Sequence, residues 1–144
     1  MAGAPPAANA LRQMLEGGPA PVCSQTLGFR KAWTQGEAVV LEYEPGAHLL
    51  NPLGTVQGGI VAAILDDVFS VAVLAKLGPD DAAPTIEMKV SYLKPVRPGV
   101  VRGIGRVLQQ GSSVAFVESE LRDAEGNLLA KASATTAIRK RAQP

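Results

Sequence analysis

Two hydrophobic patterns divide the chain into regions of predicted strand and predicted helix. Residues 29–34 and 37–44 alternate apolar and polar side chains, as strands with one buried face do. The run 60–77 is apolar almost throughout, follows the pair Gly58-Gly59 and ends at Gly78-Pro79, which predicts one long helix. Further strands are predicted at 85–93, 100–108, 113–122 and 128–138.

These elements predict an α+β fold in which an antiparallel sheet packs against one long helix. Because that helix is apolar on most sides, we expect the sheet to enclose it. Gly103 and Gly105 interrupt the apolar face of one strand, which predicts the close approach of another backbone or helix. Residues 1–144 are expected to form a single domain. Within it, Asn9 is expected to cap a short helix at about residues 10–16, and residues 1–8 are expected to be disordered.

Composition and charge narrow the classes of function. Hydrophobic residues make up 47% of the chain and charged residues 19%, values typical of a folded domain. A net charge of +1 and few aromatic residues argue against a nucleic-acid partner, and one cysteine and one histidine argue against a disulfide framework or a zinc centre. No basic residue precedes the N-terminal apolar stretch, and Asp66 and Asp67 interrupt the most apolar run. We therefore expect no secretory signal, no membrane partner and a cytoplasmic location.

The two adjacent aspartates are the first candidates for chemistry. A carboxylate on an enclosed helix costs several kcal/mol unless it is paired or protonated. No lysine or arginine lies three or four residues from Asp66 or Asp67, and only Ser70 could hydrogen-bond Asp66 across one helical turn. Two interpretations follow: the aspartates face a solvated crevice or subunit interface, or one of them is a catalytic carboxylate.

The glycine pair before the helix is the second candidate. Gly58 and Gly59 leave amide groups uncovered at the positive end of a helix, where they could stabilise an oxyanion or simply permit a tight turn. Asp66 follows Gly58 by eight residues, about 12 Å along the helix, so both cannot reach one reacting carbon within a chain. Chemistry that uses both therefore predicts a two-fold homodimer with composite sites.

The order of these motifs resembles a known family. The run from Asn51 to Ile60, followed by Asp66, is similar to the signature loop and central helix of hotdog-fold acyl-CoA thioesterases of the phenylacetate-degradation (PaaI-like) type. The later runs 92–99 and 123–130 resemble the strand-turn and hairpin patterns of that family. The likeness extends over roughly residues 41–139. It implies a hotdog fold, in which a curved antiparallel sheet wraps one long central helix, and a homodimer that doubles to a dimer of dimers.

The resemblance also implies a role for each matching residue. Asp66 resembles the catalytic carboxylate, which acts as a general base for water or as a nucleophile on the thioester carbonyl. The amide of Gly58 from the opposite subunit resembles the group that polarises this carbonyl, and Asn51 resembles the side chain that holds the water or the thioester. Gln57, Gly59, Ser70 and Thr85 match substrate-binding positions. The implied reaction is hydrolysis of an acyl- or aryl-CoA thioester, with coenzyme A as part of the substrate and neither a metal nor another cofactor.

One departure from the family pattern keeps two alternatives open. The family usually has His-Gly-Gly where this chain has Gln57-Gly58-Gly59, and glutamine cannot carry a proton. A catalytically weak or inactive acyl-CoA- or lipid-binding dimer is therefore an alternative. A hotdog enoyl-thioester hydratase is a further alternative, although the single histidine, His48, lies outside the motif. His48 and Cys23 have weaker claims to a catalytic role.

Overall fold

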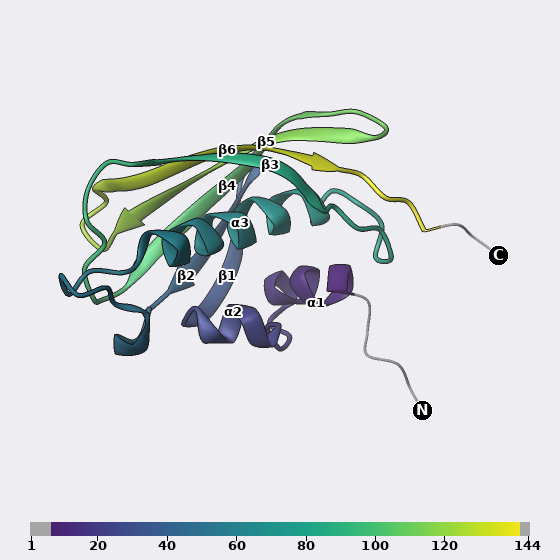
Figure 1. Cartoon of the computed structure of the whole chain (residues 1–144). Coiled ribbons are helices and arrows are strands. Elements are labelled where there is room, and N and C mark those ends of the chain that lie inside the picture. The colour runs from purple at the N-terminus through teal and green to yellow at the C-terminus, as the bar shows by residue number, and fades with distance from the viewer. Residues whose placement is uncertain (1–6, 142–144) are drawn as a thin grey trace.

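A curved antiparallel sheet wraps around one long helix in the computed structural model, which describes residues 7–141 (Figure 1). Within that range the strands form one six-stranded sheet in the order β1-β2-β4-β5-β6-β3, and every neighbouring pair is antiparallel. The α+β architecture expected from the sequence is thereby confirmed. The strands are β1 (Phe29–Gln35), β2 (Ala38–Tyr43), β3 (Thr85–Tyr92), β4 (Val101–Gln110), β5 (Val114–Asp123) and β6 (Leu128–Ala137).

Helix α3 (Gly58–Leu74) is enclosed, as its apolar sequence predicts. Ten of its residues are buried, Ile64, Leu65 and Val68 completely. The two strand glycines explain how closely it packs, because a Cβ on Gly103 would lie 2.3 Å from Cγ2 of Val68. A Cβ on Gly105 would lie 2.7 Å from the backbone oxygen of the same valine. The predicted close approach at these glycines is confirmed, and it fixes how α3 lies against the sheet.

The N-terminal segment differs in detail from the expectation. Helix α1 (Ala7–Gln13) and a 3-10 turn, η1 (Met14–Glu16), precede α2 (Val22–Thr26), and a second 3-10 turn, η2 (Ala47–Leu49), precedes α3. Because α1 begins at Ala7, Asn9 lies inside the helix and is not its cap; the expected start near residue 10 was wrong. The disorder expected at residues 1–8 falls mostly outside the described residues. Helix α1 packs against α3.

Strand β3 is an edge of the sheet and carries an irregularity that the alternating sequence does not indicate. It pairs with β6 on one side, and within the described residues no strand borders its other side. Thr85 pairs with Thr136 and Glu87 with Thr135, so a bulge at Ile86 interrupts the alternation. The bulge leaves the Ile86 side chain 59% exposed and turns Thr85 toward α3, against the alternation read from the sequence.

No helix within residues 7–141 combines the length and the apolar character that crossing a bilayer requires.

Candidate active site

Asp66 lies half-buried on α3 and lines a mostly apolar cavity. Its Oδ1 atom accepts a 2.7 Å hydrogen bond from the Thr85 hydroxyl at the start of β3. The cavity has a volume of about 320 Å³ and is lined by Asp66, Thr85 and Ser70 together with Leu11, Leu74, Ala82, Ala83 and Pro84. In the described part of the chain no donor is placed on Oδ2 of Asp66, so this oxygen is available to a water molecule or to a substrate.

Asp67 has a structural environment that separates it from its neighbour. Its Oδ2 atom accepts hydrogen bonds from the Ser24 hydroxyl at 2.7 Å and the Tyr43 hydroxyl at 3.0 Å. Burial raises the pKa of Asp67, the hydrogen bonds from Ser24 and Tyr43 oppose that rise, and the charge of Asp66 adds to it. Asp67 therefore ties α3 to α2 and β2.

Neither open interpretation of the aspartates fits Asp67, whose carboxylate is paired inside the protein, so both now concern Asp66 alone. Asp66 is the one at a cavity, whereas Asp67 is engaged by two side chains of the core. The partner suggested for Asp66 was wrong, because the hydroxyl that bonds it belongs to Thr85 and not to Ser70. Ser70 is 9% exposed and lines the same cavity one helical turn beyond Asp66.

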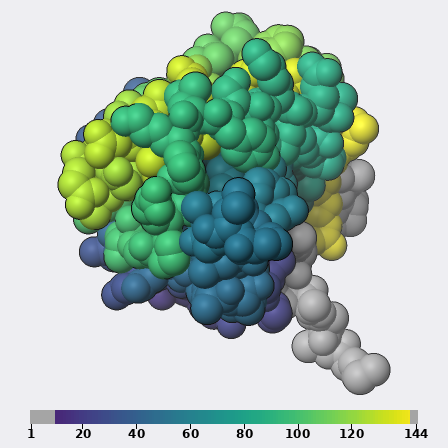
Figure 2. Space-filling model, turned by 60° about the vertical axis from the view of Figure 1, so that its left-hand side comes forward, coloured from purple at the N-terminus to yellow at the C-terminus, as the bar shows by residue number. Residues whose placement is uncertain are grey.

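The first turn of α3 holds the second group of predicted residues. Gln57 is the N-cap, and its Oε1 atom accepts a 3.1 Å hydrogen bond from the Ile60 amide. The amides of Gly58 and Gly59 lie in the first turn, where N–H groups have no carbonyl partner within a helix. The Tyr92 hydroxyl donates a 2.7 Å hydrogen bond to the carbonyl oxygen of Gly58 and so ties the end of β3 to the start of α3. Figure 2 shows the segment at the start of α3, in blue, packed beside the teal and green segments that include β3.

Asn51 shapes the loop before α3. Its Oδ1 atom accepts hydrogen bonds from the amides of Leu53 at 2.9 Å and Thr55 at 3.2 Å, and its Nδ2 donates to the Thr55 hydroxyl. Asn51 and Gly58 line one cavity of about 300 Å³ together with Tyr92. The side chain predicted to hold water or thioester is therefore engaged within its own loop, although it lies beside Gly58.

The predicted site residues thus form two groups at different points along α3. Asn51 and Gly58 line the cavity at the start of the helix, with Gln57 capping that helix, whereas Asp66, Ser70 and Thr85 line the other cavity. Asp66 does not line the cavity at Gly58, and Gly58 does not line the cavity at Asp66. This arrangement agrees with the separation worked out from the sequence.

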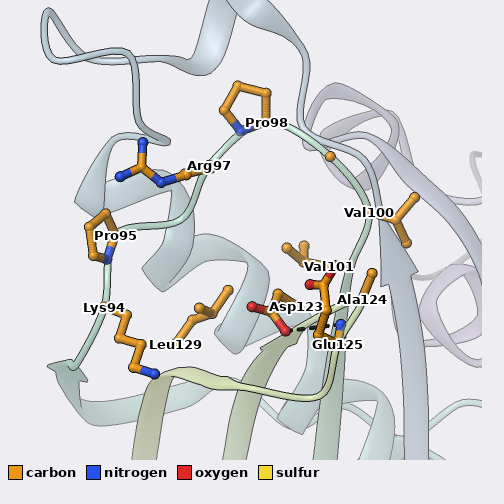
Figure 3. Close-up of a pocket in the computed structure, with 11 residues that line it drawn as sticks. Lys94, Pro95, Arg97, Pro98, Val100, Val101, Asp123, Ala124, Glu125 and Leu129 are labelled. Atoms are coloured by element: carbon orange, nitrogen blue, oxygen red, sulfur yellow. Dashed lines mark hydrogen bonds between the residues drawn. The ribbon is translucent and has the colours of Figure 1, made fainter.

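A larger cavity, of about 420 Å³, lies between the β3–β4 loop and the β5–β6 turn (Figure 3). Lys94 and Arg97 come from the loop and Asp123 and Glu125 from the turn, so charges of both signs line it. Asp123 is used in the turn itself, where its Oδ1 accepts hydrogen bonds from the amides of Glu125 and Asn127. This cavity contains none of the predicted site residues.

The remaining candidates lie apart from the cavity at Asp66. The exposed His48 has Nε2 3.4 Å from the carbonyl oxygen of Thr26, and Cys23 is exposed on α2. In residues 7–141 no three His, Cys, Asp or Glu side chains are grouped so that they could hold a metal ion. Sequence reasoning missed that Leu11 lines the cavity at Asp66 and that Tyr92 contacts Gly58. The apolar face of the N-terminal helix, which includes Leu11, and the alternation that includes Tyr92 were the signals available for these two residues.

The family of this chain follows from its similarity to known proteins. The profile of the Thioesterase superfamily matches residues 53–130, which include α3 and its candidate site residues. The chain belongs to this superfamily. Human acyl-coenzyme A thioesterase 13 is 30% identical to this chain over 97 residues, which cover 65% of this chain and 67% of the human protein. A relative from Saccharolobus solfataricus, provisionally named an esterase, is 38% identical over 79 residues, or 55% of this chain.

The chain spans only about half the length of some curated relatives. The match covers 56% of the Saccharolobus solfataricus relative and 53% of a Caenorhabditis elegans relative that also carries a provisional esterase name.

Solved structures support the superfamily fold along most of the chain. A phenylacetic acid degradation-related protein from Ralstonia eutropha superposes with a TM-score of 0.80 at 33% identity, covering 89% of this chain and 98% of its own. The PaaI protein of E. coli has a TM-score of 0.77 and covers 95% of this chain and 97% of its own, and at 17% identity it bears on the fold alone. The expected hotdog fold and the PaaI-like resemblance are confirmed.

Proposed function

We propose that the protein is an acyl-CoA thioesterase that hydrolyses an acyl- or aryl-CoA thioester to the free acid and coenzyme A. The observation that carries the proposal is the Asp66 carboxylate, which lines a mostly apolar cavity and accepts a hydrogen bond from Thr85 on one of its two oxygens. Membership of the Thioesterase superfamily and similarity to a relative named acyl-coenzyme A thioesterase support the reaction class.

The proposed chemistry uses Asp66 and the start of α3 in complementary ways. As a general base, Asp66 takes a proton from water while the oxygen of that water bonds to the thioester carbonyl carbon. The carbonyl oxygen becomes an oxyanion, which the Gly58 amide and the positive end of α3 stabilise. Collapse of this intermediate breaks the C–S bond, and the thiolate of coenzyme A takes up a proton. In the alternative route Asp66 itself attacks, and water then hydrolyses the resulting anhydride.

A homodimer would supply both groups to one site, and β3 offers the geometry for it. One end of β3 contacts Asp66 through Thr85, and the other end contacts Gly58 through Tyr92. The outer edge of β3 borders no strand within the described residues. When two such edges pair antiparallel about a two-fold axis, the Asp66 end of one subunit lies beside the Gly58 end of the other.

Charge on β3 favours one register for the proposed pairing. Directly opposed residues of an antiparallel pair point to the same face, so a symmetric pair must be centred on a single residue. Centring on Met88 places Glu87 opposite the partner's Lys89, whereas centring on Lys89 would oppose two lysines. We therefore propose the pairing centred on Met88. A further association of dimers is proposed across the outer sheet face, where Leu108 is 57% exposed and Phe116 49% exposed.

Hydration of an enoyl thioester, the other enzymatic alternative, has no support in this geometry. His48 lines neither the cavity at Asp66 nor the cavity at Gly58. The binding-only alternative rested on the absence of the usual histidine, yet Gln57 performs a helix-capping role that needs no proton.

The test is thiol release from a panel of short, medium, long and aromatic acyl-CoA esters. We expect Asp66→Asn, which keeps the size of the side chain, to lower turnover by about 10²–10⁴-fold, the usual contribution of acid–base catalysis. Turnover of Asp66→Asn within a few-fold of the wild type would refute the assignment. An inactive wild type that binds the esters would favour the binding-only alternative.

A pair of variants at residue 58 tests the role of the Gly58 amide. Gly58 is the first residue of α3, where proline is well tolerated, and Gln57 already has φ −59° and ψ 139°, which suit a residue before proline. Gly58→Pro therefore removes the amide donor with little strain. Gly58→Ala is the matched control, because its Cβ would meet Tyr92 at an ordinary 3.5 Å. We expect Gly58→Pro to lose about 10²–10³-fold in kcat and Gly58→Ala to stay near the wild type.

A further inference from the structure

The cavity at Asp66 extends along one face of α3. Asp66, Ser70 and Leu74 all line it and are spaced four residues apart, so they lie above one another on the helix. Leu74 is therefore about 12 Å beyond Asp66 along the helix axis. Ala82, Ala83 and Pro84, the segment that leads into β3, also line the cavity. Beyond the carboxylate the lining is apolar except for the hydroxyl of Ser70.

Helix α1 supplies a further wall of this cavity. Leu11 lines it although it is distant in sequence from every other lining residue. Arg12 holds α1 in place, because its Nη1 atom donates a 2.8 Å hydrogen bond to the carbonyl oxygen of Leu77, just after the end of α3. The Thioesterase superfamily profile matches residues 53–130, so Leu11 comes from a part of the chain outside the match. The wall that α1 forms is thus a feature of this chain that the family match does not imply.

We propose that Leu11 limits the length of the acyl group that the protein accepts, an inference that rests on the proposed thioesterase function. The acyl group lies along α3 from Asp66 toward Leu74, and its far end meets Leu11. Coenzyme A extends the other way, because its phosphates would lose their hydration in an apolar cavity.

The dimensions of the cavity set the size of the acyl group. With C–C bonds of about 1.5 Å, an extended alkyl chain advances about 1.25 Å per carbon, so about 12 Å holds eight to ten carbons. The cavity volume of about 320 Å³ is within the range typical of small-molecule sites. The preferred substrates are therefore medium-chain acyl-CoA esters, and longer chains must displace Leu11.

The test measures the affinity of S-alkyl-CoA thioethers, which cannot be hydrolysed, as a function of alkyl length. For the wild type we expect Kd to fall about fourfold per added methylene up to eight to ten carbons, and then to stop falling. Leu11→Ala should move this limit two to three carbons longer, and Leu11→Trp should move it shorter. Leu15→Ala is the matched control, because Leu15 also packs on the core from the N-terminal segment but does not line the cavity.

Each result is decisive for the inference. A limit that stays in place in both Leu11 variants, or that moves equally in Leu15→Ala, overturns it. Hydrolysis of the corresponding acyl-CoA esters is measured in parallel. If no ester is hydrolysed while the thioethers show the Leu11-dependent limit, the proposed function fails and the role of Leu11 stands. Hydrolysis without a Leu11-dependent limit overturns the role of Leu11 and leaves the proposed function standing.

Discussion

The two glycines of β4 allow a sharp test of how α3 is held against the sheet. A Cβ at Gly103 would lie 2.3 Å from Cγ2 of Val68, whereas carbon atoms in contact prefer about 3.5–4.0 Å. Gly103→Ala therefore requires a shift of more than about 1 Å, and we expect it to lower the free energy of unfolding by about 1–3 kcal/mol. Gly105→Ala should cost at least as much, because the obstacle is the backbone oxygen of Val68 at 2.7 Å.

The nature of each obstacle predicts a different response to Val68→Ala. That substitution removes Cγ2 and leaves Cβ of residue 68 at 3.3 Å from the new methyl group of Gly103→Ala. Val68→Ala should therefore relieve about 1–2 kcal/mol of the cost of Gly103→Ala. It should relieve much less of the cost of Gly105→Ala, because the backbone oxygen remains.

Urea denaturation measures the free energy of unfolding of the three single variants and of the two double variants that combine Val68→Ala with Gly103→Ala or Gly105→Ala. All are compared at one protein concentration, because the stability of an associating protein depends on its concentration. The two coupling energies follow from the double-mutant cycles. Equal coupling energies for Gly103 and Gly105 would refute the reasoning, as would an unfolding free energy unchanged by either alanine. Because α3 carries both Asp66 and Gly58, activity measured on the same variants shows how far this packing positions the site.

Three further predictions concern side chains around the two aspartates and at the start of α3. Thr85→Val should lower kcat/KM about tenfold through loss of the hydrogen bond to Asp66, and Thr85→Ser, which keeps the hydroxyl, should restore it; equal activity of both variants would contradict this. Asp67 has a raised pKa, so its ionised form opposes folding at neutral pH, and this cost disappears as pH falls through that pKa. The stability of the wild type relative to Asp67→Asn, followed by denaturation from pH 7 to pH 4, should therefore rise as pH falls; a flat difference would refute the assignment. Tyr92→Phe should reduce turnover with little change in unfolding free energy, because it frees the start of α3 at a partly exposed contact; unchanged turnover would show that the contact does not position Gly58.

The sequence was informative where local pattern and local chemistry agree. The long helix was predicted at 60–77 and α3 is Gly58–Leu74, so the glycine pair lies within its first turn and the helix ends before the Gly-Pro stop. Gly103 and Gly105 indicated the close approach that Val68 makes. The spacing of Gly58 and Asp66 along one helix also predicted their separation, and the two residues line different cavities. Each of these features depends on residues that are near one another in sequence or on a steric requirement of a single residue type.

The features that escaped prediction depend on contacts between distant segments. Asp67 is held by Ser24 from α2, a helix of five residues that is too short to give a periodic signal. The bulge at Ile86, which turns Thr85 toward Asp66, arises from pairing with β6 and not from the alternation within β3 itself. Leu11 reaches the cavity only because α1 packs against α3.

The composite site is the central claim, and subunit mixing tests it most directly. Asp66→Asn and Gly58→Pro are each expected to retain about 1% of the wild-type activity or less when assayed alone. When the two variants are unfolded together and refolded at equal concentration, half of the dimers contain one subunit of each kind. Each such dimer has one site with the wild-type Asp66 of one subunit and the wild-type Gly58 of the other. Activity should therefore return to about a quarter of that of the wild type treated in the same way. A mixture that stays as inactive as its two components, with mixed dimers demonstrated, would contradict a site shared between subunits.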